Sequence, residues 1–352
     1  MNPSSGVKMR IGAGLDGRLG LQFDELREAG RDAARLGFES LWTPAGGIPD
    51  AFHVCTAWAL DTPLRTGISV VPVARMWSPL ALATQAATVG QLSDGRFTLG
   101  IGTGGYGPGF WESVGMPNRP VAVMRDYLTV VRALLAGETI TYEGPALRLR
   151  DASLAVGGLP RVPVYLGALG PQMVRLAGEL ADGALLNWAT PDRIAESRRL
   201  LLEGAARAGR GPAEVSLAMY IRVCVDDDID AARQALGNQV LNYAMAAPGA
   251  PLTAGYRGLF SEMGFGEVLT ELETRKNNGE PVSALVSDVP DEFLGSVGYF
   301  GSAAGAAEAF ARLSQGLDEA IVRIVTARPG LEPVAASLEA LNPARIRKAL
   351  GA

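Results

Sequence analysis

The sequence predicts an α/β protein of the TIM-like (β/α)8 barrel class, with segments inserted at the C-terminal face of the strands. Short apolar segments alternate with amphipathic ones along nearly the whole chain, and no shift in composition marks a linker between two domains. Sequential strand–helix–strand units imply parallel strands joined by right-handed crossovers. About eight such units are found, the number at which a parallel sheet closes into a barrel. A doubly wound open sheet is the alternative fold.

The apolar segments define the expected strands, which are residues 7–13, 38–43, 66–73, 96–102, 162–167, 183–188, 216–225 and 320–325. The amphipathic segments define the expected helices, which are residues 21–37, 52–60, 79–92, 120–135, 171–180, 193–208, 229–244, 302–315 and 333–350. Apolar residues recur at helical spacing within them, as Met124, Leu128 and Val131 do. Pro120 and Pro171 suit first helical positions, where a missing amide costs nothing. Residues 139–149 are expected to form a small hairpin outside the barrel pattern.

Residues 246–296 break the alternation with a P-G-A-P stretch and several glycines. We therefore expect a single barrel domain over residues 1–352, carrying an inserted segment at about 246–296. Loops at the C-terminal face of a barrel usually carry function, which favours a lid over a plain surface excursion.

Composition excludes several classes of function. A net charge of −5 argues against a nucleic-acid-binding surface. Cys55 and Cys224 are the only cysteines and His53 is the only histidine, so neither a disulfide framework, a zinc site nor Ser-His-Asp chemistry is expected. No apolar run suits a signal peptide or a membrane span. We expect a cytoplasmic protein with no metal, nucleic-acid or membrane partner.

The segment GRFTLGIGTGGYGPGFW, from Gly95 to Trp111, contains two overlapping G-x-G-x-x-G patterns. A dinucleotide fingerprint needs a helix that begins at the glycines, but here several prolines intervene and the next long helix begins about fifteen residues later. The favoured interpretation is steric: glycines such as Gly102 and Gly104 at a strand end let a flat ring approach the main chain. A flexible turn that needs positive φ angles is the alternative.

A second segment, PVYLGALGPQMVRLAGELADGALLNW, begins at Pro163 and predicts a strand, a glycine turn and a helix. Gly170 lets the chain turn into the helix that Pro171 begins. The amides of Gly170, Gln172 and Met173 would then point out of the helix N-terminus and form a site suited to a phosphate.

Together with GISVVPVARMWSPLALATQAATVGQLSDGRFTLGIGTG and RPVAVMRDYLTVVRALLAGETITYEG, these segments resemble the bacterial luciferase-like superfamily. Within it, the chain is most similar to oxidoreductases that use the deazaflavin coenzyme F420. The resemblance implies a cofactor ring across the strand ends and a non-proline cis peptide at Ser69-Val70. It places cofactor-binding residues at Ser69, Val70, Gly102, Thr103, Gly104, Leu169, Gly170, Gln172, Met173 and Asn187.

One departure from the family pattern leaves the proton donor open. Several deazaflavin dehydrogenases carry an acid–histidine pair after the second strand, where this chain has LWTPAGG. Sugar-phosphate dehydrogenase activity is therefore not expected. His53 is the candidate substitute as catalytic residue because histidine transfers protons near neutral pH, although it could simply be a surface residue. Trp42, Tyr106 and Trp111 are candidate walls of the substrate pocket, and tryptophans of the core are the alternative.

We therefore expect a homodimeric oxidoreductase that transfers a hydride between F420 and a small organic substrate. An FMN-dependent monooxygenase on the same scaffold is one alternative, since both cofactors combine a tricyclic ring with a phosphate. A cofactor-binding protein without turnover is the other, because the acid–histidine pair is missing.

Overall fold

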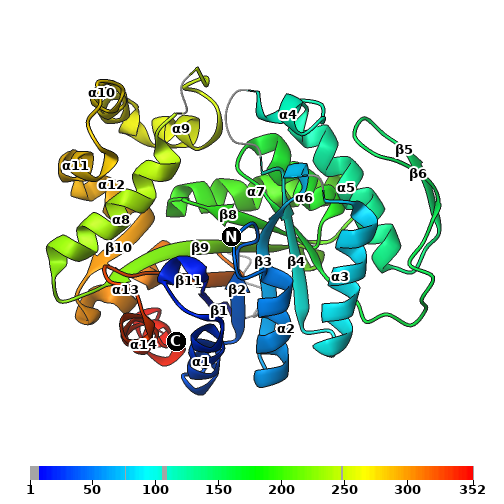
Figure 1. The fold of residues 1–352 in the computed structure, drawn as a ribbon, viewed down its shortest axis with the longest axis horizontal. Helices are drawn as coiled ribbons and strands as arrows, with labels where there is room; N and C mark the ends of the chain where they lie inside the picture. Colours follow the sequence, from blue (N-terminus) through cyan, green and yellow to red (C-terminus); the bar gives the residue numbers. More distant parts are fainter. Residues whose placement is uncertain (1–7, 76, 105–108, 247–248, 352) are drawn as a thin grey trace.

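A computed structural model of the chain contains a closed barrel of eight parallel strands surrounded by helices, which confirms the predicted fold class (Figure 1). The structure describes residues 8–75, 77–104, 109–246 and 249–351. The sheet order is β9–β11–β1–β2–β3–β4–β7–β8, and β8 also pairs with β9, so the barrel closes. Its strands are β1 (Arg10–Gly14), β2 (Ser40–Thr43), β3 (Arg65–Pro72), β4 (Phe97–Gly102), β7 (Val164–Gly167), β8 (Gly183–Asn187), β9 (Ser216–Val225) and β11 (Glu319–Val325).

Helices follow the strands and pack around the outside of the barrel. They are α1 (Phe23–Arg35), α2 (Ala51–Asp61), α3 (Pro79–Leu92), α4 (Phe110–Ser113), α5 (Pro120–Leu135), α6 (Pro171–Leu180), α7 (Pro191–Arg207), α8 (Ile229–Ala244), α13 (Ala303–Leu313), α14 (Leu331–Ala340) and α15 (Pro343–Ala349). The expected hairpin is present as β5 (Ile140–Glu143) and β6 (Arg148–Ala152). No helix in the described ranges is long and apolar enough to span a membrane.

The closing helix predicted over residues 333–350 is two helices, which corrects that expectation. Pro343 has no amide to continue α14, so it takes the first position of a new helix. The Asn342 side chain caps α15 by accepting a hydrogen bond from the Arg345 amide at 3.1 Å.

A short strand that the sequence did not predict, β10 (Gly298–Gly301), pairs with the second half of β9. The first half of β9, as far as Tyr220, pairs with β8. Beyond Tyr220 the two barrel strands therefore separate, and β10 takes the place of β8 beside β9. Four residues bounded by glycines carry too little alternation to be recognised as a strand.

The inserted segment folds as α9 (Gly255–Phe260), α10 (Gly266–Asn277), α11 (Val282–Leu285) and α12 (Asp291–Val297). In Figure 1 these helices gather in yellow and orange beside α8, on one side of the barrel. With α8 they share a hydrophobic cluster that includes Phe260 and Phe293, whose rings lie 5.1 Å apart. That this segment acts as a lid, and that the chain is one domain, remain predictions.

Candidate active site

The residues predicted to bind a cofactor lie along one arc of the barrel mouth. They lie in the second half of β3, at or just after the ends of β4, β7 and β8, and in the first turn of α6, and these four strands are neighbours in the sheet. Because parallel strands have their carboxyl ends at the same end of a barrel, these positions face a common space. The peptide bond Ser69-Val70 is cis, as the family resemblance implied.

Glycines on β4 and just after it make room for the neighbouring strand. A Cβ atom added at Gly102 would lie 2.7 Å from the Val70 side chain, and one at Gly104 would collide with Pro72. Gly104 also has a φ of +66°, which L-residues rarely adopt. The space that a side chain at these glycines would need is therefore occupied by β3 residues, and the role of Gly102 and Gly104 in cofactor binding remains a prediction.

Gly102→Ala is expected to lower the free energy of unfolding by about 1–3 kcal/mol, because the new methyl group would overpack against Val70. Urea unfolding of the two proteins measures this. Gly157→Ala is the control, since nothing lies within 4 Å of a Cβ there. Equal stabilities of the two variants would contradict the steric explanation.

The N-terminus of α6 is open, in contrast. Gly170 is its N-cap in extended conformation, and a Cβ added there would meet nothing within 4 Å. The helix's own hydrogen bonding begins with the Val174 amide on the Gly170 carbonyl at 3.1 Å. In the described part of the chain the amides of Gln172 and Met173 have no acceptor, so they and the helix dipole face the opening.

A cation accompanies these amides. Arg193 of α7 donates a hydrogen bond to the Leu169 carbonyl at 3.3 Å, beside the turn into α6. Its other guanidinium nitrogen pairs with Glu262 of the inserted segment at 3.1 Å. Free amides, a helix N-terminus and a guanidinium together suit the phosphate of a deazaflavin or flavin cofactor.

Gly170→Val is expected to weaken cofactor binding about tenfold or more, because the side chain would enter the space into which the α6 amides point. The backbone at Gly170 has φ −95° and ψ 163°, which valine adopts readily, so stability should fall only by about 1 kcal/mol, as expected for a poor N-cap residue. Fluorescence titration with F420 measures the effect. Gly157→Val, on a remote loop, should bind as the parent protein does; a similar loss there would refute the assignment.

The opposite side of the mouth contains a buried arginine without a carboxylate partner. Arg222 on β9 is 3% exposed and donates to the Asn187 amide oxygen at 2.5 Å. Its guanidinium lies 3.8 Å from the Trp188 ring and 5.0 Å from the Tyr243 ring. Within the described residues it forms no ion pair, and burial lowers its pKa to about 10. Such a cation calls for an anionic or strongly polar ligand.

Two further arginines share one carboxylate beside Arg222. Asp16 pairs with Arg18 at 2.9 Å and with Arg323 in a buried contact. Burial opposes ionisation of Asp16, but Arg323 and Arg18 together hold its pKa below the ordinary value. These residues line a small cleft of about 50 Å³. Three guanidiniums around one carboxylate leave the cleft positively charged, and its size suits one oxygen-bearing group rather than a whole substrate.

Unpaired hydroxyl groups lie between the two sides of the mouth. The Ser69 and Tyr220 hydroxyls are buried and make no hydrogen bond of good geometry among the described residues. Burial raises the pKa of Tyr220 to about 12, so its phenol keeps its proton at neutral pH. The Ser69 hydroxyl lies close enough to Tyr220 to oppose this rise, but the two form no hydrogen bond of good geometry. Buried polar atoms are normally satisfied, so a bound polar molecule is expected to complete their hydrogen bonding.

The inserted segment reaches this site. Asn187 donates a hydrogen bond to the Tyr256 hydroxyl at 2.8 Å. The Tyr256 ring meets that of Tyr243 edge to face, with centroids 4.9 Å apart. Trp188, which follows Asn187, has a φ of +58°, a strained conformation for a tryptophan that often marks functional sites.

The other predicted residues are placed as follows. His53 lies in the first turn of α2, after β2, but its side chain is 78% exposed and bonds Asp50 at 2.8 Å, so its catalytic role remains a prediction. Trp111 in α4 is half-buried against Phe110, and its role also remains a prediction. Tyr106 falls outside the described residues. No group of three or more metal-binding side chains occurs in the described ranges.

Trp42 differs from the expectation that it forms a pocket wall. It is 2% exposed inside the barrel, where its indole nitrogen donates to Glu319 at 2.8 Å. A Cβ at Gly67 would collide with its ring, so the indole is enclosed by the barrel's own strands. The structure thus places Trp42 in the core.

Sequence reasoning missed the cationic side of the mouth. The sequence does contain an indication of this side: Arg222 and Arg323 each interrupt an otherwise apolar strand, in SLAMYIRVCV and EAIVRIV. Alternation along β9 also places Tyr220 on the same face as Arg222.

Comparison with known proteins identifies the relatives of this barrel. Residues 5–319 match the sequence profile of the family described as luciferase-like monooxygenase. The chain belongs to this family. Its relatives include a 5,10-methylenetetrahydromethanopterin reductase of Methanolobus tindarius, 31% identical over 62% of this chain and 66% of that protein. Another is an F420-dependent glucose-6-phosphate dehydrogenase of Microbacterium testaceum, 30% identical over 59% of this chain and 66% of that protein. The alignments thus span just under two thirds of these relatives.

A solved structure shares the fold of this luciferase-like protein over nearly its whole length. The coenzyme F420-dependent tetrahydromethanopterin reductase of Methanopyrus kandleri superimposes with a TM-score of 0.76 at 21% identity, covering 96% of this chain and 99% of that one. The family resemblance inferred from the sequence motifs is confirmed.

Proposed function

We propose that this luciferase-like protein is an F420-dependent oxidoreductase that transfers a hydride between the deazaflavin and a small substrate bearing a carbonyl, hydroxyl or carboxylate oxygen. The observation that carries the proposal is an open phosphate site at α6 that lies across the same mouth from Arg222, a buried cation with no ion pair among the described residues. The names of the sequence relatives support F420 over FMN.

The residues on the β3–β8 arc fit such a cofactor. The amides of Gln172 and Met173 and the Arg193 guanidinium would bind its phosphate, and Ser69 would offer a free hydroxyl near the ring. Asn187 and Thr103 would lie along its edge. When bound, F420 would supply or accept the hydride at its central ring; the protein would bind, orient and exclude water.

The chain's own residues can stabilise the negative charge that develops during hydride transfer and can supply a proton. Reduction of a carbonyl places negative charge on oxygen, which Arg222 and the Tyr220 hydroxyl would stabilise from fixed positions. Tyr243 would provide the proton. Although burial raises its pKa, the Arg222 and Arg18 guanidiniums outweigh that effect and lower it below the ordinary value. This makes Tyr243 a better donor than an ordinary phenol.

A substrate panel tests the proposal. Reduced F420 is mixed with the protein and, in turn, with aldehydes, ketones, enones and keto acids, and cofactor oxidation is followed by absorbance. We expect oxidation with at least one class under anaerobic conditions. No oxidation with any of them would favour a binding protein without turnover, and oxygen-dependent consumption of reduced FMN would favour the monooxygenase alternative.

The assembly state and location belong to the proposal as well. We expect a cytoplasmic homodimer, by resemblance to the family, and light scattering of the purified protein would measure its mass in solution.

A further inference from the structure

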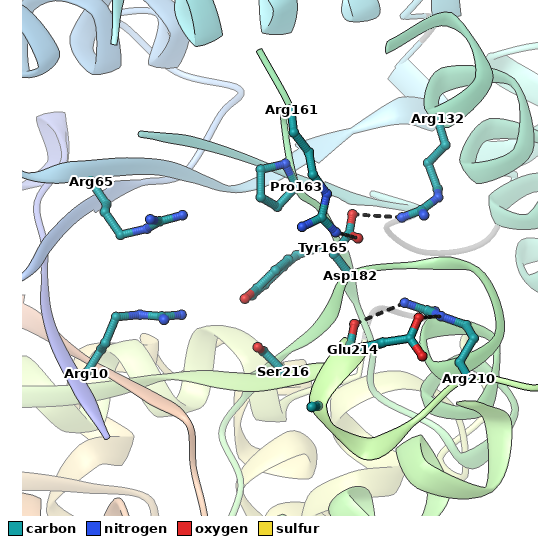
Figure 2. A pocket seen from close by; sticks show the side chains of 11 residues that line it. Arg10, Arg65, Arg132, Arg161, Pro163, Tyr165, Asp182, Arg210, Glu214 and Ser216 are labelled. Carbon is teal, nitrogen blue, oxygen red and sulfur yellow. Dashed lines mark hydrogen bonds and ion pairs between the residues drawn. The ribbon is translucent and has the colours of Figure 1, made fainter. Parts of the chain in front are cut away.

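A second cavity, of about 370 Å³, lies at the opposite end of the barrel from the candidate active site (Figure 2). Arg10, Arg65 and Ser216 line it, and they are the first residues of β1, β3 and β9. Its volume falls within the range of roughly 300–1,000 Å³ typical of small-molecule sites. We propose that this cavity binds a multiply charged oxyanion, such as an organic phosphate or a polycarboxylate.

The charges around the cavity are unbalanced. Five arginines line it, at positions 10, 65, 132, 161 and 210, together with the two carboxylates Asp182 and Glu214. Glu319 adds a third carboxylate through its pair with Arg10 at 2.9 Å. Among the described residues, two positive charges therefore remain uncompensated. Guanidinium groups bind phosphates and carboxylates through two parallel hydrogen bonds, which favours a ligand with at least two negative charges.

Arg65 is the strongest indication of a missing partner. Its half-buried side chain makes no hydrogen bond or ion pair with the described part of the chain, although its amide donates to the Glu39 carbonyl at 3.3 Å. Figure 2 shows its guanidinium beside that of Arg10, both extending toward the end of the Tyr165 ring. Both are close enough to lower the pKa of the Tyr165 phenol, although burial raises it overall. Two neighbouring cations repel each other unless an anion lies between them.

The remaining arginines are held in place by the protein. Arg132 and Arg161 bind the two oxygens of Asp182 at 2.7 and 2.6 Å. Arg210 donates to the Gly178 and Ala181 carbonyls, both at 2.7 Å, at the end of α6. Each guanidinium has five N–H donors, so these bonds leave donors available. Because the side chains are already ordered, a ligand would bind with little loss of conformational entropy.

The cavity is separated from the active site by the barrel core. Glu319 accepts hydrogen bonds from Arg10 on the cavity side and from the buried Trp42 indole on the inner side. Tyr220 and Ile321 pack above Trp42 in the same interior cluster. An anion in this cavity would therefore occupy a site distinct from the cationic cleft near Arg222.

Isothermal titration with inorganic pyrophosphate, and separately with citrate, tests the proposal at constant ionic strength. We expect one anion per chain and at least tenfold weaker binding by Arg65→Gln. Arg150→Gln is the matched control, because Arg150 is exposed on β6 and lines neither cavity. Arg18 lines the small cleft near Arg222 at the other end of the barrel, so Arg18→Gln should leave anion binding in the 370 Å³ cavity unchanged.

Three results would overturn the proposal: absence of binding to the parent protein, equal weakening in Arg65→Gln and Arg150→Gln, or weakening in Arg18→Gln alone. The Arg65 side chain has no partner to lose among the described residues, so Arg65→Gln should fold normally, which its melting temperature checks. If it does not, Arg161→Gln replaces it, since that side chain is 77% exposed. Severalfold weaker binding in Arg161→Gln supports the site, and unchanged binding refutes it.

Discussion

Arg222→Leu is expected to lower kcat/KM about 10²–10³-fold, the usual loss when a fixed donor to a developing oxyanion is removed. Arg222 is buried with no carboxylate partner among the described residues, and its main hydrogen bond is to Asn187. Burying a charge without an ion pair is costly, so removing this cation should offset the loss of its hydrogen bond to Asn187. Activity should therefore fall while the free energy of unfolding is unchanged or rises. Steady-state kinetics and urea unfolding of the same variant measure both.

Arg257→Leu is the matched control for this prediction. Arg257 is nearly as buried, at 5% exposure, but pairs with Glu273 at 2.9 Å within the inserted segment. Its removal would leave a buried carboxylate uncompensated, so we expect destabilisation by about 3–5 kcal/mol. A strongly destabilised Arg222→Leu with normal kinetics would show that Arg222 is structural.

Tyr243→Phe is expected to lower the rate of carbonyl reduction about 10²-fold, since general acid catalysis contributes typically that much or more. Phenylalanine preserves the edge-to-face contact with Tyr256 and the ring beneath Arg222. The sign of the pH dependence follows from the lowered pKa. The phenol donates only while protonated, so the parent rate should fall as pH rises through a value below 10. The variant should lack this alkaline decline.

His53→Ala tests the competing assignment from the sequence. With its side chain 78% exposed and bonded to Asp50, His53 should be dispensable, and activity should stay within about twofold of the parent. If His53→Ala lost activity while Tyr243→Phe kept the rate and pH dependence of the parent, His53 and not Tyr243 would be the proton donor.

The fold was predictable because its signals are local and repeated. Buried parallel strands are continuous apolar runs, and amphipathic helices follow them, so alternation along the chain defined the barrel. The failures occurred where local signals were short or ambiguous. β10 has four residues, and the pattern over residues 333–350 hid a helix boundary that Pro343 imposes.

The site was predictable only in part, because tertiary contacts decide what a residue does. The sequence could not show that Val70 and Pro72 fill the space beside Gly102 and Gly104. The open turn at Gly170 followed from the glycine–proline sequence before α6. Arg222 was overlooked because its meaning depends on its forming no ion pair with the described carboxylates, which only the three-dimensional arrangement reveals.

Titration of the purified protein with F420 and, separately, with FMN tests directly whether this protein uses F420 as its cofactor. We expect saturable binding of one F420 per chain, weakened in Gly170→Val and unaffected in Gly157→Val, with FMN binding at least tenfold weaker. Tight binding of FMN together with no binding of F420 would contradict this expectation.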